Sequence, residues 1–235
     1  MKIGFLSDAH GNPEGVAVCL DVLRRAGADK VFFLGDAVGY LSGWGDVLSL
    51  LFDNGVRCLR GNHDQAVLSG QIEANGESVY QLYAEFHEQI RGHRQWMSEW
   101  PIRLDEDFCG YRITMVHGSP RAPLSGYVYP WTELSTQSDF DADVILMGHT
   151  HRPFVREIGG KLIINVGSCG LPRDVGNLAC CATFDCGKRE AKVFRVMYSV
   201  EKLLARVRIP HPEVLRCLER RTENYVGELV SEIGK

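Results

Sequence analysis

Histidine and acidic residues recur where the predicted strands of this chain end. Asp8 and His10 follow an apolar run at residues 2–6, and Asp36 follows a second run at 30–34. Later runs at 56–59, 111–116 and 144–147 are followed by Asn62, His63 and Asp64, then by His117, and then by His149 and His151. Asp8 and Asp36 are 28 residues apart and Asp36 and Asn62 are 26 apart, which in each case is one strand–helix–strand circuit. The carboxyl ends of parallel strands meet at the sheet edge where ligands bind, so we expect these side chains to gather there.

These residue types are metal ligands. Imidazole, carboxylate and amide groups suit Mn²⁺, Fe or Zn²⁺. Their number is too large for one four-coordinate ion, so the pattern favours two ions that share one carboxylate. Two ions about 3.5–4 Å apart activate a water molecule and stabilise in-line displacement at phosphorus. Helix caps, turns and surface histidines explain any one of these motifs alone, but they do not explain the whole ordered series.

The elements that must position these residues alternate between strands and helices in the first third of the chain. We expect strands at 2–6, 30–34 and 56–59, with helices at 13–26 and 44–52 between them. Continuous apolar strands joined by helices indicate a parallel sheet that is buried on both faces. A helical insert follows at about 65–100, and strands are then expected at 102–108, 111–116, 144–147, 154–158, 161–166, 179–185 and 190–196. Helices at 200–208 and 212–225 complete one α/β domain over residues 1–235, with 178–235 belonging to that same domain.

Composition excludes several classes of protein. Lys and Arg number 26 against 30 Asp and Glu, and this net charge of −4 argues against an electrostatic binder of nucleic acid. Every apolar run is strand-sized and the N-terminus carries no signal peptide, so we expect a cytoplasmic protein without a membrane span.

The eight cysteines are scattered without a C-x-x-C pair, which is typical of free buried thiols in a reducing compartment. Residues 188–221 carry ten Lys and Arg and four Glu, which we interpret as a solvated helical face rather than a nucleic-acid groove. The sequence is compatible with a homo-oligomer.

Five short segments together resemble the calcineurin-like metallophosphoesterase superfamily. They are SDAHGN at 7–12, LGDAVGY at 34–40, RGNHD at 60–64, VHGSP at 116–120 and GHTH at 148–151. The resemblance covers residues 3 to about 170. It implies a four-layer α/β/β/α sandwich with a dinuclear metal centre.

The resemblance also implies a role for each matching residue. Asp8, His10 and His151 would bind one ion, Asn62, His117 and His149 the other, and Asp36 would bridge them. His63 is similar to the family's non-ligand histidine, which protonates the leaving oxygen, and Asp64 would orient it. An acid that protonates the leaving group is needed on the side opposite the attacking hydroxide. The ions would be divalent, with Mn²⁺ favoured and Fe, Zn²⁺, Ni²⁺ or Mg²⁺ as alternatives.

Departures from the pattern of the family's protein phosphatases narrow the range of expected substrates. That branch carries G-D-x-x-D-R-G, whereas residues 35–40 here read GDAVGY and so lack the phosphate-clamping Arg. Together with residues 117–130 and 165–174, this form is more similar to small prokaryotic phosphoesterases. The expected substrate is therefore a small, nucleotide-like phosphate ester and not a phosphoprotein.

Four residues outside the metal motifs are candidates for substrate contacts. Arg121, Tyr127 and Tyr129 lie on a Pro- and Gly-rich loop directly after His117, and Arg173 follows a second loop. An Arg can clamp a distal phosphate and a Tyr can stack on a base. Packing of the tyrosines within the loop, and a salt bridge from Arg173 to Asp174 or another acid, are the alternatives for these residues.

The sequence therefore predicts a hydrolase that acts on a phosphodiester, a nucleotide or a dinucleoside polyphosphate. In this prediction a hydroxide that bridges two metal ions attacks the phosphorus. A non-catalytic metal-binding scaffold and a nuclease remain as alternatives. The retention of every ligand and of His63 argues against a scaffold, and the absence of room for a nucleic-acid groove argues against a nuclease.

Overall fold

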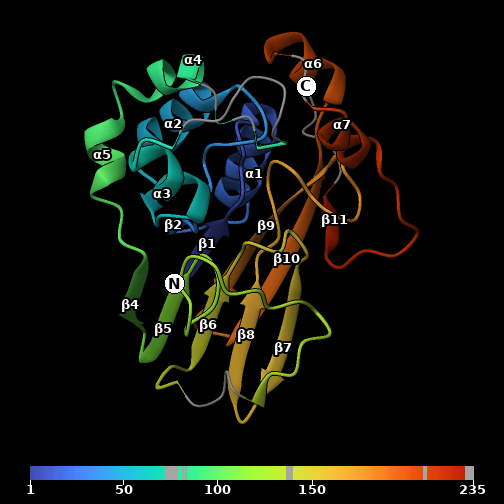
Figure 1. Ribbon diagram of the computed structural model, residues 1–235. Helices are drawn as coiled ribbons and strands as arrows, with labels where there is room; N and C mark the ends of the chain where they lie inside the picture. The colour runs from blue at the N-terminus through green and yellow to red at the C-terminus, as the bar shows by residue number, and fades with distance from the viewer. Residues whose placement is uncertain (72–78, 81, 83, 136–139, 209–210, 231–235) are drawn as a thin grey trace.

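Two β-sheets stand at the centre of the computed structural model, which describes residues 1–71, 79–80, 82, 84–135, 140–208 and 211–230. The six-stranded sheet has the order β11-β10-β9-β1-β2-β3, and the five-stranded sheet has the order β4-β5-β6-β8-β7 (Figure 1). Among the described residues, no helix is long and apolar enough to span a bilayer.

The first half of the six-stranded sheet is built from the predicted strand–helix units. Strands β1 (Lys2–Leu6), β2 (Lys30–Phe33) and β3 (Arg57–Cys58) are parallel, and α1 (Pro13–Arg25) and α2 (Trp44–Asp53) connect them. Helix α1 begins where its sequence signals predict. The side chain of Asn12 accepts a hydrogen bond from the Gly15 amide at 3.0 Å, and Pro13 occupies the first turn. One apolar core lies between these helices and the sheet.

The C-terminal strands extend the same sheet. Strand β9 (Leu178–Asp185) runs antiparallel to β1, β10 (Glu190–Met197) pairs with β9, and β11 (Glu228–Val230) runs parallel to β10. Helix α6 (Val200–Arg206) ends two residues before the predicted boundary. The prediction of one helix over 212–225 was wrong, because α7 (Pro212–Glu219) stops and the chain returns to the sheet edge as β11. The guanidinium of Arg195 anchors this return, since it donates to the carbonyl oxygen of Val226 at 3.3 Å.

The second sheet contains the two predicted hairpins. Strands β4 (Arg103–Phe108) and β5 (Tyr111–Val116) form one hairpin, β7 (Phe154–Ile158) and β8 (Lys161–Asn165) form the other, and β6 (Val144–Met147) lies between them. Its inner face packs on the first sheet through residues such as Phe5, Phe32 and Leu146. Its outer face is covered by Val128 and Leu134, which belong to the segment after β5. In the described part of the chain this segment forms the outermost layer of the sandwich.

The region predicted as a helical insert consists of short helices. They are α3 (Asn62–Leu68), α4 (Ala84–His87), the 3₁₀ helix η1 (Glu88–Ile90) and α5 (Arg94–Ser98). Residues 72–78, 81 and 83 of this insert lie outside the described residues. All eight cysteines are free, as predicted, and Cys109 differs from the other seven because it is exposed in the β4–β5 turn.

Candidate metal centre

The loops that follow β1, β2, β5 and β6 meet at the carboxyl edge of the sheets. Backbone hydrogen bonds join the loops directly: the Asp8 amide donates to the carbonyl oxygen of Gly35 at 2.9 Å, and the His10 amide donates to that of Asp36 at 3.0 Å. The amide of His149 donates to Oδ2 of Asp8 at 3.0 Å, which ties the β6 loop to the β1 loop. The strand ends thus bring residues from both sheets to one place, whereas the sequence spacing predicts the meeting of Asp8, Asp36 and Asn62 at the edge of one sheet.

The backbone is strained at this edge. Six residues of the loops have a positive φ between 49° and 66°, a region that non-glycine residues seldom adopt: Asp8, His10, Asp36, Tyr40, His149 and His151. Strain of this kind costs about 1–3 kcal/mol per residue and collects at functional sites. The surrounding structure therefore holds these side chains in positions that the backbone would not choose alone.

Two glycines allow the loops to approach one another. A Cβ on Gly61 would lie 2.1 Å from Oδ1 of Asp36, and a Cβ on Gly148 would lie 2.5 Å from Oδ2 of Asp8. Any side chain at these positions would displace a carboxylate. Close approach of the backbone thus explains why glycine stands beside the acidic residues.

The predicted ligands form two adjoining groups around Asp36. In the first group, Nε2 of His10 lies 3.1 Å from Nε2 of His151, and Nε2 of His151 lies 3.3 Å from Oδ1 of Asp8. In the second group, Nε2 of His117 lies 3.0 Å from Nδ1 of His149 and 3.1 Å from Oδ1 of Asn62. Oδ2 of Asp36 stands between the groups, 3.7 Å from His10 Nε2 and 3.2 Å from His117 Nε2.

Backbone carbonyl groups fix how three of the imidazoles are protonated. Nδ1 of His10, His117 and His151 lies 3.0, 2.9 and 2.6 Å from the carbonyl oxygens of Val38, Leu34 and Leu171, respectively. A carbonyl oxygen can only accept, so each Nδ1 carries a hydrogen and each neutral ring directs the lone pair of Nε2 inward. The lone pairs of His10 and His151 therefore face each other at 3.1 Å, an arrangement that a shared cation would stabilise.

Burial and the charges at the centre favour the protonation states in which these side chains bind a metal ion. Burial opposes the charge of Asp8, yet the imidazoles of His151 and His117 hold the pKa of Asp8 below its usual range. Asp36 behaves in the same way, with His117 and His63 lowering its pKa against the effect of burial. Burial lowers the pKa of His10 and, with the help of His117, lowers the pKa of His149 to about 4. Ionised carboxylates and neutral imidazoles are the forms that bind metal.

His117 differs from His10 and His149, because its pKa is raised. This shift indicates that the local electrostatic potential is negative. Burial alone would lower the pKa of His117, but Asp36 and Asp8 raise it to about 9. The two buried carboxylates thus attract a positive charge to the middle of the centre. A divalent cation would supply that charge in place of the proton.

These residues fit a metal ion. Ligand atoms about 2.1 Å from one ion lie about 3.0–3.4 Å from one another in octahedral or tetrahedral geometry. Five contacts of 3.0 to 3.3 Å match that spacing. Nε2 of His10 lies farther from the carboxylates, at 3.8 Å from Oδ1 of Asp8 and 3.7 Å from Oδ2 of Asp36. Within the described part of the chain, Oδ1 of Asp8 is buried and accepts no hydrogen bond, which leaves it available as a ligand.

His63 lies beside the ligand groups, and its neighbours are aromatic rings. Its ring centroid lies 5.0 Å from that of His10 and 5.1 Å from that of Tyr40, and its Nδ1 is buried without a hydrogen-bond partner among the described residues. Burial lowers the pKa of His63. The His63 side chain also lines the cavity above the ligand groups, and this places the ring where it can exchange a proton with a bound substrate.

Asp64 has a different position from the one its orienting role requires. Its carboxylate accepts three backbone N–H groups, from Asp36 at 2.7 Å, Ala37 at 2.9 Å and Gly61 at 2.9 Å. The expectation that Asp64 orients the His63 ring is therefore corrected: the carboxylate holds the loop that carries Asp36. Asp64 is the third residue of α3, where an acidic side chain commonly folds back onto the amide preceding the helix.

Aromatic and basic side chains wall a cavity of about 690 Å³ above these groups. Three of the predicted substrate residues, Tyr127, Tyr129 and Arg173, line it, and Arg173 donates to the Tyr40 hydroxyl at 3.3 Å. Arg121 is not among the lining residues, and its guanidinium packs over the ring of Phe140 at 5.3 Å. Sequence reasoning missed the six other aromatic or charged residues of the wall, which are Tyr40, Tyr80, Trp131, Arg152, Glu213 and Arg220, as well as Val79 and Thr150.

Signals for some of these residues were present in the sequence. Tyr40 ends the LGDAVGY segment and Arg152 follows the GHTH segment, so both lie next to ligand-bearing motifs. Trp131 continues the alternation of Tyr127 and Tyr129. Arg220 carried no local signal, because α7 reaches the cavity through tertiary packing.

The basic segment 188–221 has mixed roles and is not one solvated face. Arg195 is fully buried, and its two terminal nitrogens bind the carboxylate of Asp174 at 2.6 and 2.7 Å. Arg206 bridges Glu14 and Asp46 on the surface, both at 2.8 Å. Because Asp174 pairs with Arg195, the predicted alternative partner of Arg173 is already engaged.

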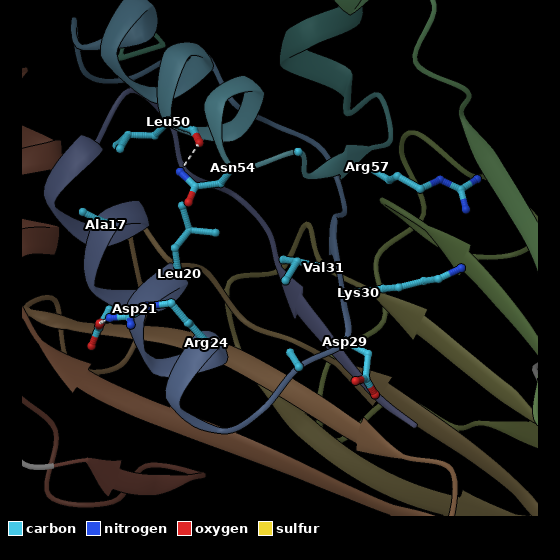
Figure 2. Close-up of a pocket in the computed structure, with 12 residues that line it drawn as sticks. Ala17, Leu20, Asp21, Arg24, Asp29, Lys30, Val31, Leu50, Asn54 and Arg57 are labelled. Atoms are coloured by element: carbon cyan, nitrogen blue, oxygen red, sulfur yellow. Dashed lines mark hydrogen bonds and ion pairs between the residues drawn. The ribbon is translucent and has the colours of Figure 1, made fainter.

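A second cavity, of about 630 Å³, lies at the opposite edge of the six-stranded sheet. Figure 2 shows Leu20, Val31 and Leu50 between α1, β2 and α2, with Asp29, Lys30 and Arg57 toward the strand starts. It contains no histidine, and its acidic residues are Asp21 and Asp29. Asp21 is paired with Arg24 and Arg25 of its own helix.

Comparisons with known proteins agree with this geometry. Residues 1–189 match the family model of the calcineurin-like phosphoesterase superfamily domain. An uncharacterized protein of Methanocaldococcus jannaschii is 28% identical over an alignment of 224 positions, and this alignment covers 87% of this chain and 91% of that protein. A metallophosphoesterase of Sphaerobacter thermophilus is 27% identical with a TM-score of 0.71, covering 87% of this chain and 92% of its own. A hypothetical protein of Pyrococcus horikoshii OT3 shares the fold, with 20% identity and a TM-score of 0.80 over 97% and 99% of the two chains.

Proposed function

The chain belongs to the calcineurin-like phosphoesterase superfamily, and from this premise we propose that it hydrolyses a small phosphate ester with the help of two divalent metal ions. Asp8, His10 and His151 would bind one ion, and Asn62, His117 and His149 the other. Asp36 would bridge them. The proposed substrate is a phosphodiester, a nucleotide or a dinucleoside polyphosphate, and Mn²⁺ is the favoured ion.

One observation carries the proposal. Three imidazoles donate from Nδ1 to backbone carbonyl groups and present Nε2 to the carboxylates of Asp8 and Asp36. A structural histidine cluster would be expected to use these nitrogens in hydrogen bonds to one another or to donors. Nε2 of His10 and Nε2 of His151 face each other as two acceptors, and the carboxylates hold a proton on His117. Both features support binding of cations.

Two ions at this centre would lower the pKa of a water molecule and neutralise the charge that develops on the phosphoryl oxygens. The chain's own residues supply the remaining parts. His63 would donate a proton to the leaving oxygen from its position beside the first ligand group. Asp64 would keep the Asp36 loop in place, and the rings and arginines of the cavity wall would hold the rest of the substrate.

The cavity supports a small anionic substrate. Arg152, Arg173 and Arg220 line its wall, while Glu213 is the acidic residue among the lining residues outside the ligand groups. The free cysteines, seven of which are buried, support a reducing, cytoplasmic location.

Metal titration combined with a substrate panel tests the proposal. Metal-depleted protein should recover activity on Mn²⁺ addition, with elemental analysis giving two ions per chain. The panel contains bis(p-nitrophenyl) phosphate, nucleoside monophosphates, dinucleotides and dinucleoside polyphosphates. Loaded protein that hydrolyses none of them would favour the metal-binding scaffold, and full activity with one ion would contradict the dinuclear assignment.

A further inference from the structure

Three aromatic rings form a stepped row that leads from the metal centre to the surface. The ring centroids of Tyr127 and Tyr129 lie 6.0 Å apart with planes 9° from parallel, and those of Tyr129 and Trp131 lie 5.2 Å apart at 5°. At the inner end, Tyr127 lies 4.2 Å from the ring centroid of His149. We refer to Tyr127, Tyr129 and Trp131 as the aromatic row.

The rings are offset, which leaves parts of their faces open. Face-to-face contact would bring rings to about 3.5–4.0 Å, and the centroid distances of 5.2 and 6.0 Å are longer. Tyr127 is 60% exposed and Trp131 is 71% exposed, although large aromatic residues are usually buried. Both belong to the wall of the cavity above the ligand groups.

The fold holds this row in place. Val128, between the first two rings, is buried against the outer face of the second sheet, so the rings alternate toward the cavity side. Nη1 of Arg156 donates to the carbonyl oxygens of Pro130 at 3.1 Å and Thr132 at 2.7 Å. The Tyr129 amide donates to Oγ1 of Thr132 at 2.8 Å. A row fixed in this way loses little conformational entropy when a ligand binds.

Positive charge accompanies the row. The guanidinium of Arg152 lies 5.9 Å from the ring centroid of Trp131, and Arg173 and Arg220 line the same cavity. Planar rings combined with arginines match a ligand that joins a flat aromatic group to phosphate. Nucleobases stack on such rings without regard to sequence, and arginine binds phosphate through two hydrogen bonds.

We propose that the aromatic row is a nucleobase subsite, in which a base of the substrate stacks on Tyr129 and Trp131 while Arg152 binds a phosphate beyond the scissile one. This inference rests on the proposed function, and it specifies a nucleotide as the substrate class. A simple aryl or alkyl phosphate would reach the ligand groups without using Trp131.

Binding to metal-depleted, full-length protein tests the subsite apart from hydrolysis. The two ligands are AMP and ribose 5-phosphate, measured by titration calorimetry. Because both carry the same phosphate, the ratio of their dissociation constants isolates the base. We expect AMP to bind at least about 10-fold more tightly, with this preference lost in Tyr129→Ala and Trp131→Ala and largely kept in Trp131→Phe.

A matched control uses an aromatic residue elsewhere on the surface. Phe52 on α2 is 55% exposed and does not line the cavity, so Phe52→Ala should keep the preference for AMP. In the Mn²⁺-loaded enzyme, the Ala variants of the row should raise the KM for a dinucleotide about 10-fold and leave kcat nearly unchanged.

The outcomes separate the subsite from the proposed function. Equal binding of AMP and ribose 5-phosphate, or a preference that survives both Ala variants, would overturn the subsite even if hydrolysis is found. A base-dependent preference that disappears in both variants would support the subsite even if the loaded protein hydrolyses nothing, and the proposed function would then fail alone.

Discussion

Two cavities of similar volume lie at opposite edges of the six-stranded sheet, and the chemistry of their linings differs. The one at the strand ends measures about 690 Å³ and adjoins buried carboxylates and imidazoles. The one at the strand starts measures about 630 Å³ and combines an apolar floor with surface ion pairs. Volume therefore does not identify the functional edge, whereas the chemistry of the lining does.

The backbone conformation also differs between the two edges of the sheet. At the strand ends, Asp8, Asp36 and His149 adopt positive φ values although they carry side chains. At the strand starts, positive φ values occur at Gly27 and Gly55, where helices end and glycine adopts them without strain. Strain is thus concentrated where buried ligands must converge, and the relaxed edge shows ordinary helix termination.

Replacing one acid at each edge should give the largest contrast. Asp36→Asn removes the charge shared by both ligand groups, so metal affinity and kcat/KM should each fall more than about 100-fold, the upper range for losing an outer-shell partner of a ligand. Asp29→Asn changes an exposed carboxylate that accepts the Lys2 amide at 2.7 Å and should leave both quantities unchanged. Elemental analysis and steady-state kinetics measure the two effects. Two tightly bound ions in Asp36→Asn would contradict the bridging role.

His63→Gln should separate proton donation from metal binding at the active edge. If His63 protonates the leaving group, kcat falls about 10²–10⁴-fold while metal content stays near that of the wild type. The loss should be smaller for p-nitrophenyl esters, because p-nitrophenolate leaves without a proton. Parallel assays with an alkyl ester and an aryl ester measure this difference. An equal loss on both would argue that His63 supports the fold or the ligands instead.

The contrast between the edges also marks what the sequence could predict. Ends of neighbouring parallel strands meet, so the convergence of Asp8 and Asp36 follows from strand order. His117 follows β5 of the second sheet and joins them only because the two sheets pack face to face. The wall of the cavity does not follow from strand order, because Trp131 lies on a loop and Arg220 directly follows the distant helix α7. Neither carries a periodic signal. Tertiary packing of α7 and the return of the chain as β11 decide where Arg220 lies.

The position of Asp64 illustrates the same limit within a recognised motif. Its residue type and its place beside His63 favour an orienting role, but its partners are amide groups of a loop 27 and 28 residues away. The contact with the Gly61 amide follows the common pattern of an acidic third helix residue, but the contacts with Asp36 and Ala37 leave no trace in the sequence. Only the folded chain shows that this carboxylate acts on Asp36.

Asp64→Asn tests this positioning role and should have a moderate effect. One amide oxygen cannot accept all three N–H groups, so the Asp36 loop should loosen and metal affinity should fall about 10–100-fold. The free energy of unfolding should fall by about 1–3 kcal/mol, because buried donors lose their acceptor. Metal titration and urea unfolding measure the two changes. If Asp64 acted through His63, kcat alone would fall and metal affinity would stay constant.

Arg24→Ala at the opposite edge should have the smallest effect. The Arg24 side chain is 77% exposed and pairs with Asp21, but Asp21 keeps Arg25 as a partner at 2.7 Å after the substitution. Exposed ion pairs contribute about 0–1 kcal/mol, so the free energy of unfolding should change by less than about 0.5 kcal/mol. Metal content and kcat/KM should equal those of the wild type, because the strand starts and the ligand groups are separated by the length of β2. Urea unfolding and dinucleotide hydrolysis measure both quantities in one preparation. A severalfold change in kcat/KM with unchanged stability would mean that the second cavity communicates with the metal centre, and the distinction between the two edges would then fail.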